Sequence, residues 1–146
     1  MPTQFAGDEL ARACAAAMLS RDRAAQALCI AIEEAREGYA RLAMTIGETM
    51  LNGHAMAHGG VVFTFADTAF ALACNSRNVP HVALSATISF VKPARVGERL
   101  VAEAQERSLK GRTGVYDINV TNVVTGELIG VFRGICYRIH GEVLTV

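Results

Sequence analysis

The sequence predicts an α+β fold in which an antiparallel sheet wraps around one long central helix. Segment 59–76 is apolar along nearly its whole length, which is typical of a helix buried on almost all sides. The segments on either side alternate between apolar and polar residues, as strands do, and short turns separate the later ones. Short connections join antiparallel neighbours, and the helix is too apolar for a surface, so we expect the sheet to enclose it.

The chain begins with a predicted helical extension over residues 1–26. Residues 8–20 are rich in alanine and start with acidic side chains, which favours a helix. A short second helix is expected over 23–28. The central helix then follows a loop at 47–53.

The strands are expected in two groups, one before and one after the central helix. The first group is a hairpin of 29–37 and 39–46, with its turn at Gly38. The second group begins at 81–91, where Lys92-Pro93 ends the strand because proline cannot donate to a ladder. The apolar residues of this strand are predicted on one face, and they are Val82, Leu84, Ala86, Ile88 and Phe90. The last three strands are expected at 98–109, 113–123 and 128–140.

Composition predicts a single domain over residues 1–146. Hydrophobic residues make up 51% of the chain and charged residues 19%, which suits a well-filled core. The formal net charge is zero, so the sequence shows no excess of positive charge that would indicate nucleic-acid binding. The four cysteines form no C-x-x-C motif, which is typical of reduced thiols in a cytoplasmic protein.

No membrane segment is expected either. The longest apolar run, from Val61 to Cys74, has about 14 residues and contains Asp67, whereas a spanning helix needs about 20. The first residues carry acids and no apolar core, so we do not expect a signal peptide. A near-neutral surface with this much apolar content favours a homo-oligomer.

One polar stripe interrupts the apolar helix. Its members are spaced so that they share one helix face, and they are Thr64, Asp67, Thr68 and Asn75. A buried carboxylate costs several kcal/mol unless something pairs with it. We therefore expect Asp67 to have a functional role, with a structural role tied to Thr64, Thr68 or backbone groups as the alternative.

The stretch from Met50 to Ser76 reads MLNGHAMAHGGVVFTFADTAFALACNS, and it carries Asn-Gly-His, His-Gly-Gly and Ala-Asp-Thr-Ala in order. This pattern resembles the signature of the PaaI-type acyl-CoA thioesterases of the phenylacetate pathway, which have the hotdog fold. The later stretches TGVYDINV and FRGICYRI are also similar to that family. The resemblance covers roughly residues 27–141.

The resemblance implies an enzyme that hydrolyses aryl-acetyl-CoA thioesters, such as phenylacetyl-CoA or its ring-hydroxylated forms, to the free acid and CoA. It implies no metal and no organic cofactor. It also implies a homotetramer built as a dimer of dimers, with the sites at subunit interfaces.

Thioester hydrolysis needs a polarised carbonyl and an activated water or a nucleophile. The start of a helix offers free N–H groups and a positive dipole, and Gly59 and Gly60 let a substrate approach the backbone there. We therefore assign the Gly59 N–H as the main oxyanion donor and Asp67 as general base or nucleophile. The alternative for the glycines is that they only permit a tight turn into the helix.

The spacing of these two residues has a geometric consequence. Gly59 and Asp67 are eight residues apart, which is about 12 Å along one helix. One thioester carbonyl cannot easily touch both. The simplest solution is a dimer in which Gly59 of one subunit faces Asp67 of the other, with two sites per dimer.

Three neighbouring residues are candidates for supporting roles. Asn52 either holds the water or carboxylate, or forms an Asn-Gly turn. His58 either orients the thioester region or caps the helix start. Thr68 either steadies Asp67 or the water, or bonds back to its own helix.

Two further groups concern ligands. His54 and His58 have a spacing that binds zinc on a helix, but they fall in a glycine-flanked loop without a third ligand, so no metal is expected. The phosphates of CoA call for basic residues near turns, and Lys92 is one candidate. The best candidate is the turn Lys110-Gly111-Arg112, whose alternative is a solvated charged turn.

The competing function is a non-catalytic acyl-CoA-binding hotdog protein. A regulator of that kind usually needs a DNA-binding segment, and the residues before the first expected strand carry no basic cluster. The retained Asp67 also favours an enzyme. A hotdog hydratase would be expected to carry a different pair of histidine and acid, and the sequence has no such pattern.

Overall fold

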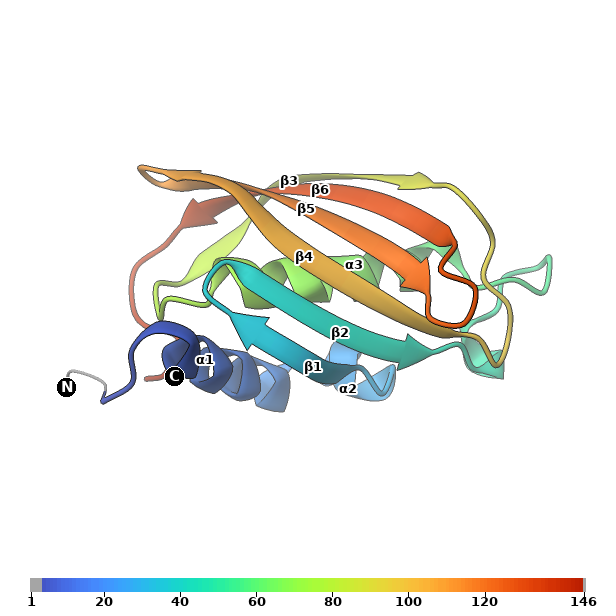
Figure 1. Cartoon of the computed structure of the whole chain (residues 1–146), viewed down its shortest axis with the longest axis horizontal. Helices are drawn as coiled ribbons and strands as arrows, with labels where there is room; N and C mark the ends of the chain where they lie inside the picture. The colour runs from blue at the N-terminus through green and yellow to red at the C-terminus, as the bar shows by residue number, and fades with distance from the viewer. Residues whose placement is uncertain (1–3, 146) are drawn as a thin grey trace.

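The computed structural model describes residues 4–145 and forms an α+β fold with one sheet (Figure 1). The helices of the described chain are α1 (Gly7–Arg21), α2 (Arg23–Ala27), the 3₁₀ turn η1 (Glu48–Met50) and α3 (Gly59–Cys74). The strands are β1 (Ala31–Arg36), β2 (Tyr39–Thr45), β3 (His81–Phe90), β4 (Arg99–Lys110), β5 (Thr113–Asn122) and β6 (Leu128–Arg138). Each element lies where the sequence predicts it, within a few residues at its ends.

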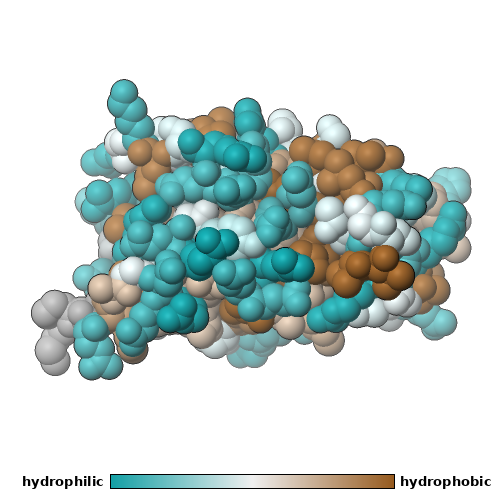
Figure 2. Space-filling model, viewed as in Figure 1, coloured by the Kyte–Doolittle hydropathy of each residue, from teal (hydrophilic) through white to brown (hydrophobic). Residues whose placement is uncertain are grey.

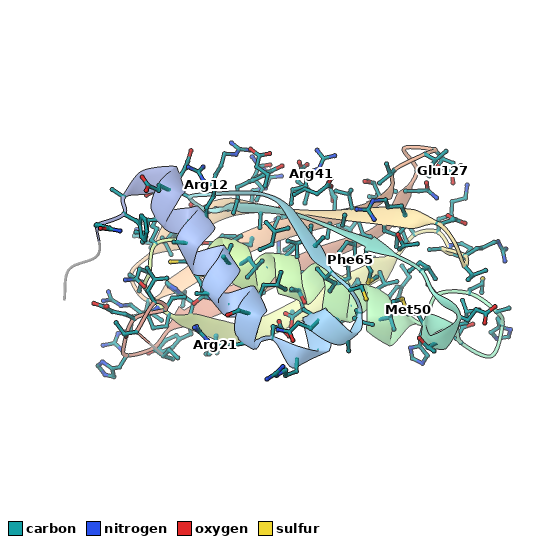
Figure 3. The ribbon with its side chains drawn as sticks, turned by 90° about the horizontal axis from the view of Figure 1, so that it is seen from below. Arg12, Arg21, Arg41, Met50, Phe65 and Glu127 are labelled. Atoms are coloured by element: carbon teal, nitrogen blue, oxygen red, sulfur yellow. The ribbon has the colours of Figure 1, made fainter. Side chains whose placement is uncertain are left out.

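The six strands form a single sheet in the order β1-β2-β4-β5-β6-β3, and every neighbouring pair is antiparallel. The sheet curves around α3, which contacts all six strands (Figure 1). The predicted fold class is therefore confirmed. From below, α1 crosses over α3 and α2 lies beside it, so the N-terminal extension covers part of the helix that the sheet leaves open (Figure 3).

Aromatic packing fixes α3 against the sheet. The Phe70 ring lies against Gly134 of β6, where an added Cβ would come within 2.7 Å of the ring. Phe70 also makes an edge-to-face contact with the buried ring of Tyr116, with centroids 5.7 Å apart. The absence of a side chain at position 134 therefore allows the helix to approach the sheet closely.

The central helix differs in two ways from the prediction. It ends at Cys74 rather than Ser76, because the Asn75 side chain bonds Ala71 O (2.8 Å) and accepts the His81 N–H (2.8 Å). It is also less enclosed than expected, since the stripe of Gly60, Thr64, Asp67 and Ala71 is half-buried or exposed.

The predicted faces of β3 are partly wrong. A bulge between Ala83 and Ser85 adds one residue to the strand, so Val82 pairs with Tyr137 on the outer face. Ala86 and Ile88 still face the core, where they pair with Gly134 and Phe132. The bulge shifts the alternation by one residue, which a regular pattern of period two cannot anticipate.

The outer face of the sheet is mostly hydrophilic. In Figure 2, apolar side chains gather at the upper right, over the end of β3 and the start of β6. The exposed apolar residues in these regions include Phe90, Val91 and Val131. No helix within residues 4–145 is long and apolar enough to cross a membrane.

Candidate active site

The start of α3 is capped so that one glycine amide stays free. His58 is the N-cap residue, and its Nδ1 accepts the Gly60 N–H at 2.9 Å. Its carbonyl accepts the N–H groups of Val61 (2.9 Å) and Val62 (3.1 Å). Within residues 4–145 the Gly59 N–H has no protein acceptor. Gly59 thus offers an unpaired donor at the positive end of a helix, where an anionic oxygen is favoured.

Asn52 organises the loop that leads to this helix. Its Oδ1 accepts the N–H groups of His54 (2.8 Å) and Met56 (3.2 Å), and its own N–H donates to Met56 O at 2.7 Å. The loop closes through the His58 N–H, which donates to Met50 O at 2.8 Å. Asn52 therefore forms a turn, which is one of the two roles that the sequence left open for it. It also borders the cavity described next.

A cavity of about 330 Å³ opens in front of Gly59. Its lining combines loop, helix and strand ends, and includes Asn52, Met56, Gly59, Phe90, Lys92 and Ile129. The Phe90 ring packs against Gly59, since a Cβ on that glycine would lie 3.0 Å from Phe90 Cζ. Phe90 is nevertheless 58% exposed, so its ring is an apolar wall beside the free amide. We call this space the Gly59 cavity.

Asp67 lies two turns further along α3 and does not line the Gly59 cavity. Its carboxylate is half-buried and receives no hydrogen bond from any residue between 4 and 145. Burial raises the pKa of the Asp67 carboxyl, and the negative charge of Asp22, at the corner between α1 and α2, raises it further. An incompletely solvated carboxylate without a partner is a stronger base than a solvated one.

The other predicted residues of α3 behave structurally. The Thr68 hydroxyl donates to Thr64 O at 2.7 Å, which is the alternative that the sequence left open for it. Thr64 in turn donates to Gly60 O at 2.9 Å. These bonds run along the helix, so neither hydroxyl proton points at Asp67.

The basic candidates are divided between the two ends of the molecule. Lys92 lines the Gly59 cavity and forms an ion pair with Glu127. Lys110, Gly111 and Arg112 form the tip of the β4–β5 hairpin, at the other end of the sheet (Figure 1). Within one chain the structure therefore brings together Asn52, Gly59 and Lys92, but not the hairpin tip or Asp67.

Sequence reasoning missed Phe90 as a neighbour of Gly59. It placed Phe90 only as the last apolar residue of a strand. The contact joins the end of β3 to the start of α3, which are about thirty residues apart, so no local pattern indicates it.

Residues 54–129 match the family model of the thioesterase superfamily. The chain belongs to the thioesterase superfamily. It is 45% identical over 127 residues to the acyl-coenzyme A thioesterase PaaI of Escherichia coli (strain K12), with 87% of this chain and 90% of that protein covered. It is 38% identical over 125 residues to a putative esterase of Archaeoglobus fulgidus, covering 86% of this chain and 80% of the relative.

Solved structures place this thioesterase-superfamily chain in the hotdog fold. The E. coli PaaI protein from the phenylacetic acid degradation operon superposes with a TM-score of 0.90 at 44% identity, covering 92% of this chain and 97% of that one. The TT0310 protein of Thermus thermophilus superposes with a TM-score of 0.78 at 37% identity, covering 82% and 99%. The predicted resemblance to PaaI-type proteins is confirmed.

Proposed function

We propose that this chain is an acyl-CoA thioesterase that hydrolyses aryl-acetyl-CoA thioesters, such as phenylacetyl-CoA or its ring-hydroxylated forms, to the free acid and CoA. The free Gly59 N–H at the start of α3 carries the proposal. The similarity to a protein named acyl-coenzyme A thioesterase supports the reaction, and the apolar Phe90 wall beside Gly59 supports an aromatic acyl group.

The Gly59 N–H polarises the thioester carbonyl and stabilises the oxyanion that forms on it. Asp67 then acts in one of two ways. As a general base it takes a proton from water, the hydroxyl adds to the carbonyl carbon, and the CoA thiolate leaves. As a nucleophile it attacks the carbonyl carbon and expels the thiolate, and water then cleaves the mixed anhydride.

The two groups are supplied by different subunits in this proposal. Gly59 and Asp67 are separated by two turns of one rigid helix, and only one of them borders the Gly59 cavity. Strand β3 is an edge strand with exposed apolar side chains at Val82, Leu84 and Phe90, which suits pairing with a second copy. Antiparallel pairing of two β3 strands makes the two α3 helices antiparallel, so each Gly59 faces the partner's Asp67. A dimer of such dimers gives the tetramer.

The first test is thiol release from phenylacetyl, hydroxyphenylacetyl, benzoyl and aliphatic CoA thioesters, with wild type beside Asp67→Asn. We expect preference for aryl-acetyl groups and a loss of kcat of about 10²–10⁴-fold in the variant. Activity that survives the substitution would remove Asp67 from the chemistry. CoA binding without release from any thioester would instead support the non-catalytic protein.

Subunit complementation tests the shared site. Gly59→Pro removes the donor and Asp67→Asn removes the carboxylate, so each variant alone is expected to be inactive. In an equal mixture of co-assembled subunits, half of the dimers combine both variants and each has one intact site, which restores about a quarter of wild-type activity. Mixtures that stay inactive would place both groups in one subunit.

A further inference from the structure

The end of α1 lies on the side of α3 that the sheet leaves open. Ala11 and Ala15 are buried on one face of α1 and Met18 continues that face, while Asp22 follows four residues later as the C-cap residue. Met18 and Asp22 are only half-buried. In Figure 3, α1 crosses over α3, and the chain then turns into α2, which lies beside α3. The end of α1 therefore borders α3 without being fully covered.

Hydrogen bonds fix the shape of the turn between α1 and α2, and we call residues 18–26 the α1–α2 corner. The Asp22 carboxylate accepts the Ala25 N–H at 2.9 Å and so caps α2. The Gln26 side chain donates to Leu19 O and to Ser20 O, both at 2.9 Å, which joins α2 to the last carbonyls of α1. None of these bonds involves α3, so the corner itself sets the position of Asp22.

The polar stripe of α3 faces the α1–α2 corner. Asp67 is half-buried on this stripe. Burial raises the pKa of the Asp67 carboxyl and the negative charge of Asp22 raises it further, so the two carboxylates are close enough to repel each other. The hydroxyls of Thr64 and Thr68 donate to backbone carbonyls of α3 and therefore do not shield Asp67 from Asp22.

No cation of the described chain offsets this repulsion. Within residues 4–145, Asp67 forms no ion pair. The two arginines of the corner are directed to other acceptors: Arg21 donates to Val143 O at 3.0 Å, and Arg23 donates to Gln26 Oε1 at 3.4 Å. The corner thus presents an acid to Asp67 although it also contains two bases.

The other elements packed against α3 add no charge beside Asp67. Of their acids, bases and histidines, those that are not exposed are Asp22, His81, Glu106 and Asp117. Arg77 binds Glu106 at 2.9 Å, Arg133 binds Asp117 at 2.6 Å, and the His81 ring bonds a backbone carbonyl of its own loop. The other titratable group of α3, Cys74, is a buried thiol whose pKa is raised by its hydrogen bond with a neighbouring thiol and by burial, so it is uncharged. Asp22 remains the acid that acts on Asp67.

The fold does not require a charge at position 22. Asn and Ser cap helices about as well as Asp does, and each would avoid the repulsion with Asp67. Because α2 has only five residues, its dipole compensates a carboxylate only weakly. A charge that costs stability and lies next to a proposed catalytic carboxylate indicates a functional role.

Met18 supplies apolar surface to the same place. It precedes Asp22 by about one helical turn, and it packs against the hydrophobic core without being fully covered. In the proposed site the thioester carbonyl lies between Asp67 of one subunit and Gly59 of the other, so the acyl group extends along the surface beside Asp67. Methionine side chains adapt to irregular apolar groups, and Met18 therefore suits contact with an aromatic acyl group.

We propose that the α1–α2 corner belongs to the active site that its own Asp67 serves, with Met18 in contact with the acyl group and Asp22 as a positioning residue whose charge acts on Asp67. The inference rests on the proposed function. The match to the family model begins at residue 54, so the corner lies outside the matched residues. The N-terminal extension then contributes both to the strength of the base and to acyl selectivity.

Asp22→Asn keeps a capping acceptor and removes the charge. Activity on phenylacetyl-CoA falls at low pH as Asp67 becomes protonated, and we expect this acid limb of kcat/KM to move to lower pH in the variant, because the Asp22 charge raises the pKa of Asp67. Asp8→Asn is the matched control, since it makes the same exchange at the exposed start of α1 and should leave the limb in place. A limb that stays in place in Asp22→Asn, or moves equally in Asp8→Asn, would overturn the role of Asp22.

Met18→Ala tests the contact with the acyl group. We expect kcat/KM for phenylacetyl-CoA to fall about tenfold or more relative to butanoyl-CoA, whose short chain lacks the ring. Leu10→Ala truncates another half-buried residue of α1, about two turns earlier, and should leave the ratio of the two substrates unchanged. An unchanged ratio in Met18→Ala, or the same change in Leu10→Ala, would contradict the contact. Thermal melting checks that each variant folds.

Nuclear magnetic resonance separates this inference from the proposed function, because it needs no turnover. The carbon-13 methyl signal of Met18, assigned with Met18→Leu, should shift when the thioether analogue of phenylacetyl-CoA is added. The titration of the Asp67 carboxyl, followed by carbon-13 resonance, should move to lower pH in Asp22→Asn. If wild type cleaves no thioester, the proposed function fails and these two signals still decide the role of the corner. A Met18 signal that the analogue does not move overturns the contact.

Discussion

His58 Nδ1 accepts the backbone N–H of Gly60 at 2.9 Å, and this bond determines which amide at the start of α3 is free. A helix start has several unpaired N–H groups, and a capping side chain satisfies one of them. Here the cap removes Gly60 from competition and leaves Gly59 as the donor next to the Gly59 cavity. In the proposed mechanism, the His58 cap thus leaves the Gly59 N–H as the oxyanion donor.

This relationship predicts different outcomes for two substitutions at position 58. His58→Ala removes the cap, which should cost about 0.5–2 kcal/mol of unfolding free energy and lower kcat. His58→Asn keeps a capping acceptor on a backbone that is already extended (φ −60°, ψ 133°), so stability and activity should stay close to wild type. Urea unfolding and steady-state kinetics measure both. If the Asn variant folds normally but loses activity and its pH profile shifts, His58 takes part in proton transfer.

Gly59→Pro should remove the oxyanion donor with little loss of fold. Gly59 is the first residue of α3, where proline is well accommodated, and the extended His58 before it suits a following proline. We expect kcat to fall about 10²–10³-fold, while the melting temperature changes little.

Gly59→Ala is the control for this substitution, because it adds a Cβ against the far end of the exposed Phe90 ring but keeps the N–H. Alanine should retain most of the activity. Equal losses in both variants would mean that the space at Gly59 matters rather than its amide.

Asp67→Asn should stabilise the folded protein at neutral pH. Burial and Asp22 raise the pKa of the Asp67 carboxyl above its unfolded value of about 3.9, so the folded state binds this proton more tightly than the unfolded state. Stability should therefore fall as pH rises from about 3.9 through the raised pKa, and the loss should persist above it. Asparagine carries no charge and avoids that loss.

Urea unfolding of wild type and Asp67→Asn at pH 7 and pH 4 measures this difference. The advantage of the variant should be largest at pH 7 and shrink as pH approaches 4. A variant that is less stable than wild type at pH 7 would mean that the carboxylate has a stabilising partner.

Gly134→Ala should destabilise the core. The added Cβ would lie 2.7 Å from the Phe70 ring, which is buried and cannot move away, so we expect a loss of about 1–3 kcal/mol. Gly130→Ala is the matched control on the same strand, where the nearest atom to the new Cβ is Ser89 O at 3.5 Å. Chemical denaturation should separate the two variants clearly, and similar losses would attribute the effect to glycine replacement in β6 in general.

Much of the fold follows from local pattern in the sequence. The apolar segment from Gly59 onward predicts the central helix. The alternation in Tyr39–Thr45 predicts the inward face of β2, where Leu42 and Met44 are buried. The bulge in β3 was not predictable, because one extra residue reverses the faces before it without changing the composition of the strand.

The candidate site, like the fold, could be predicted from the sequence only in part. The sequence pattern is sufficient to place Gly59 and Asp67 on one helix, because their spacing is local. It does not reveal the packing of Phe90 on Gly59, since this contact joins distant segments. It also leaves the role of Thr68 open, because a hydroxyl bonded to its own helix and one bonded to a carboxylate have the same sequence.

The loop around Asn52 is nearly self-contained, because most of its hydrogen bonds lie within residues 50–58. Its turn depends on one side chain and a few backbone bonds within residues 50–58, and the Ala57 N–H adds an anchor to Ala94 O at 2.8 Å. Because α3 is fixed against the sheet by Phe70 and Gly134, and at its start by the His58 cap, changes confined to residues 51–57 should leave the helix in place. Under the proposed function, residues 51–57 are therefore a segment that can be exchanged between relatives to change acyl selectivity while His58 and α3 stay constant.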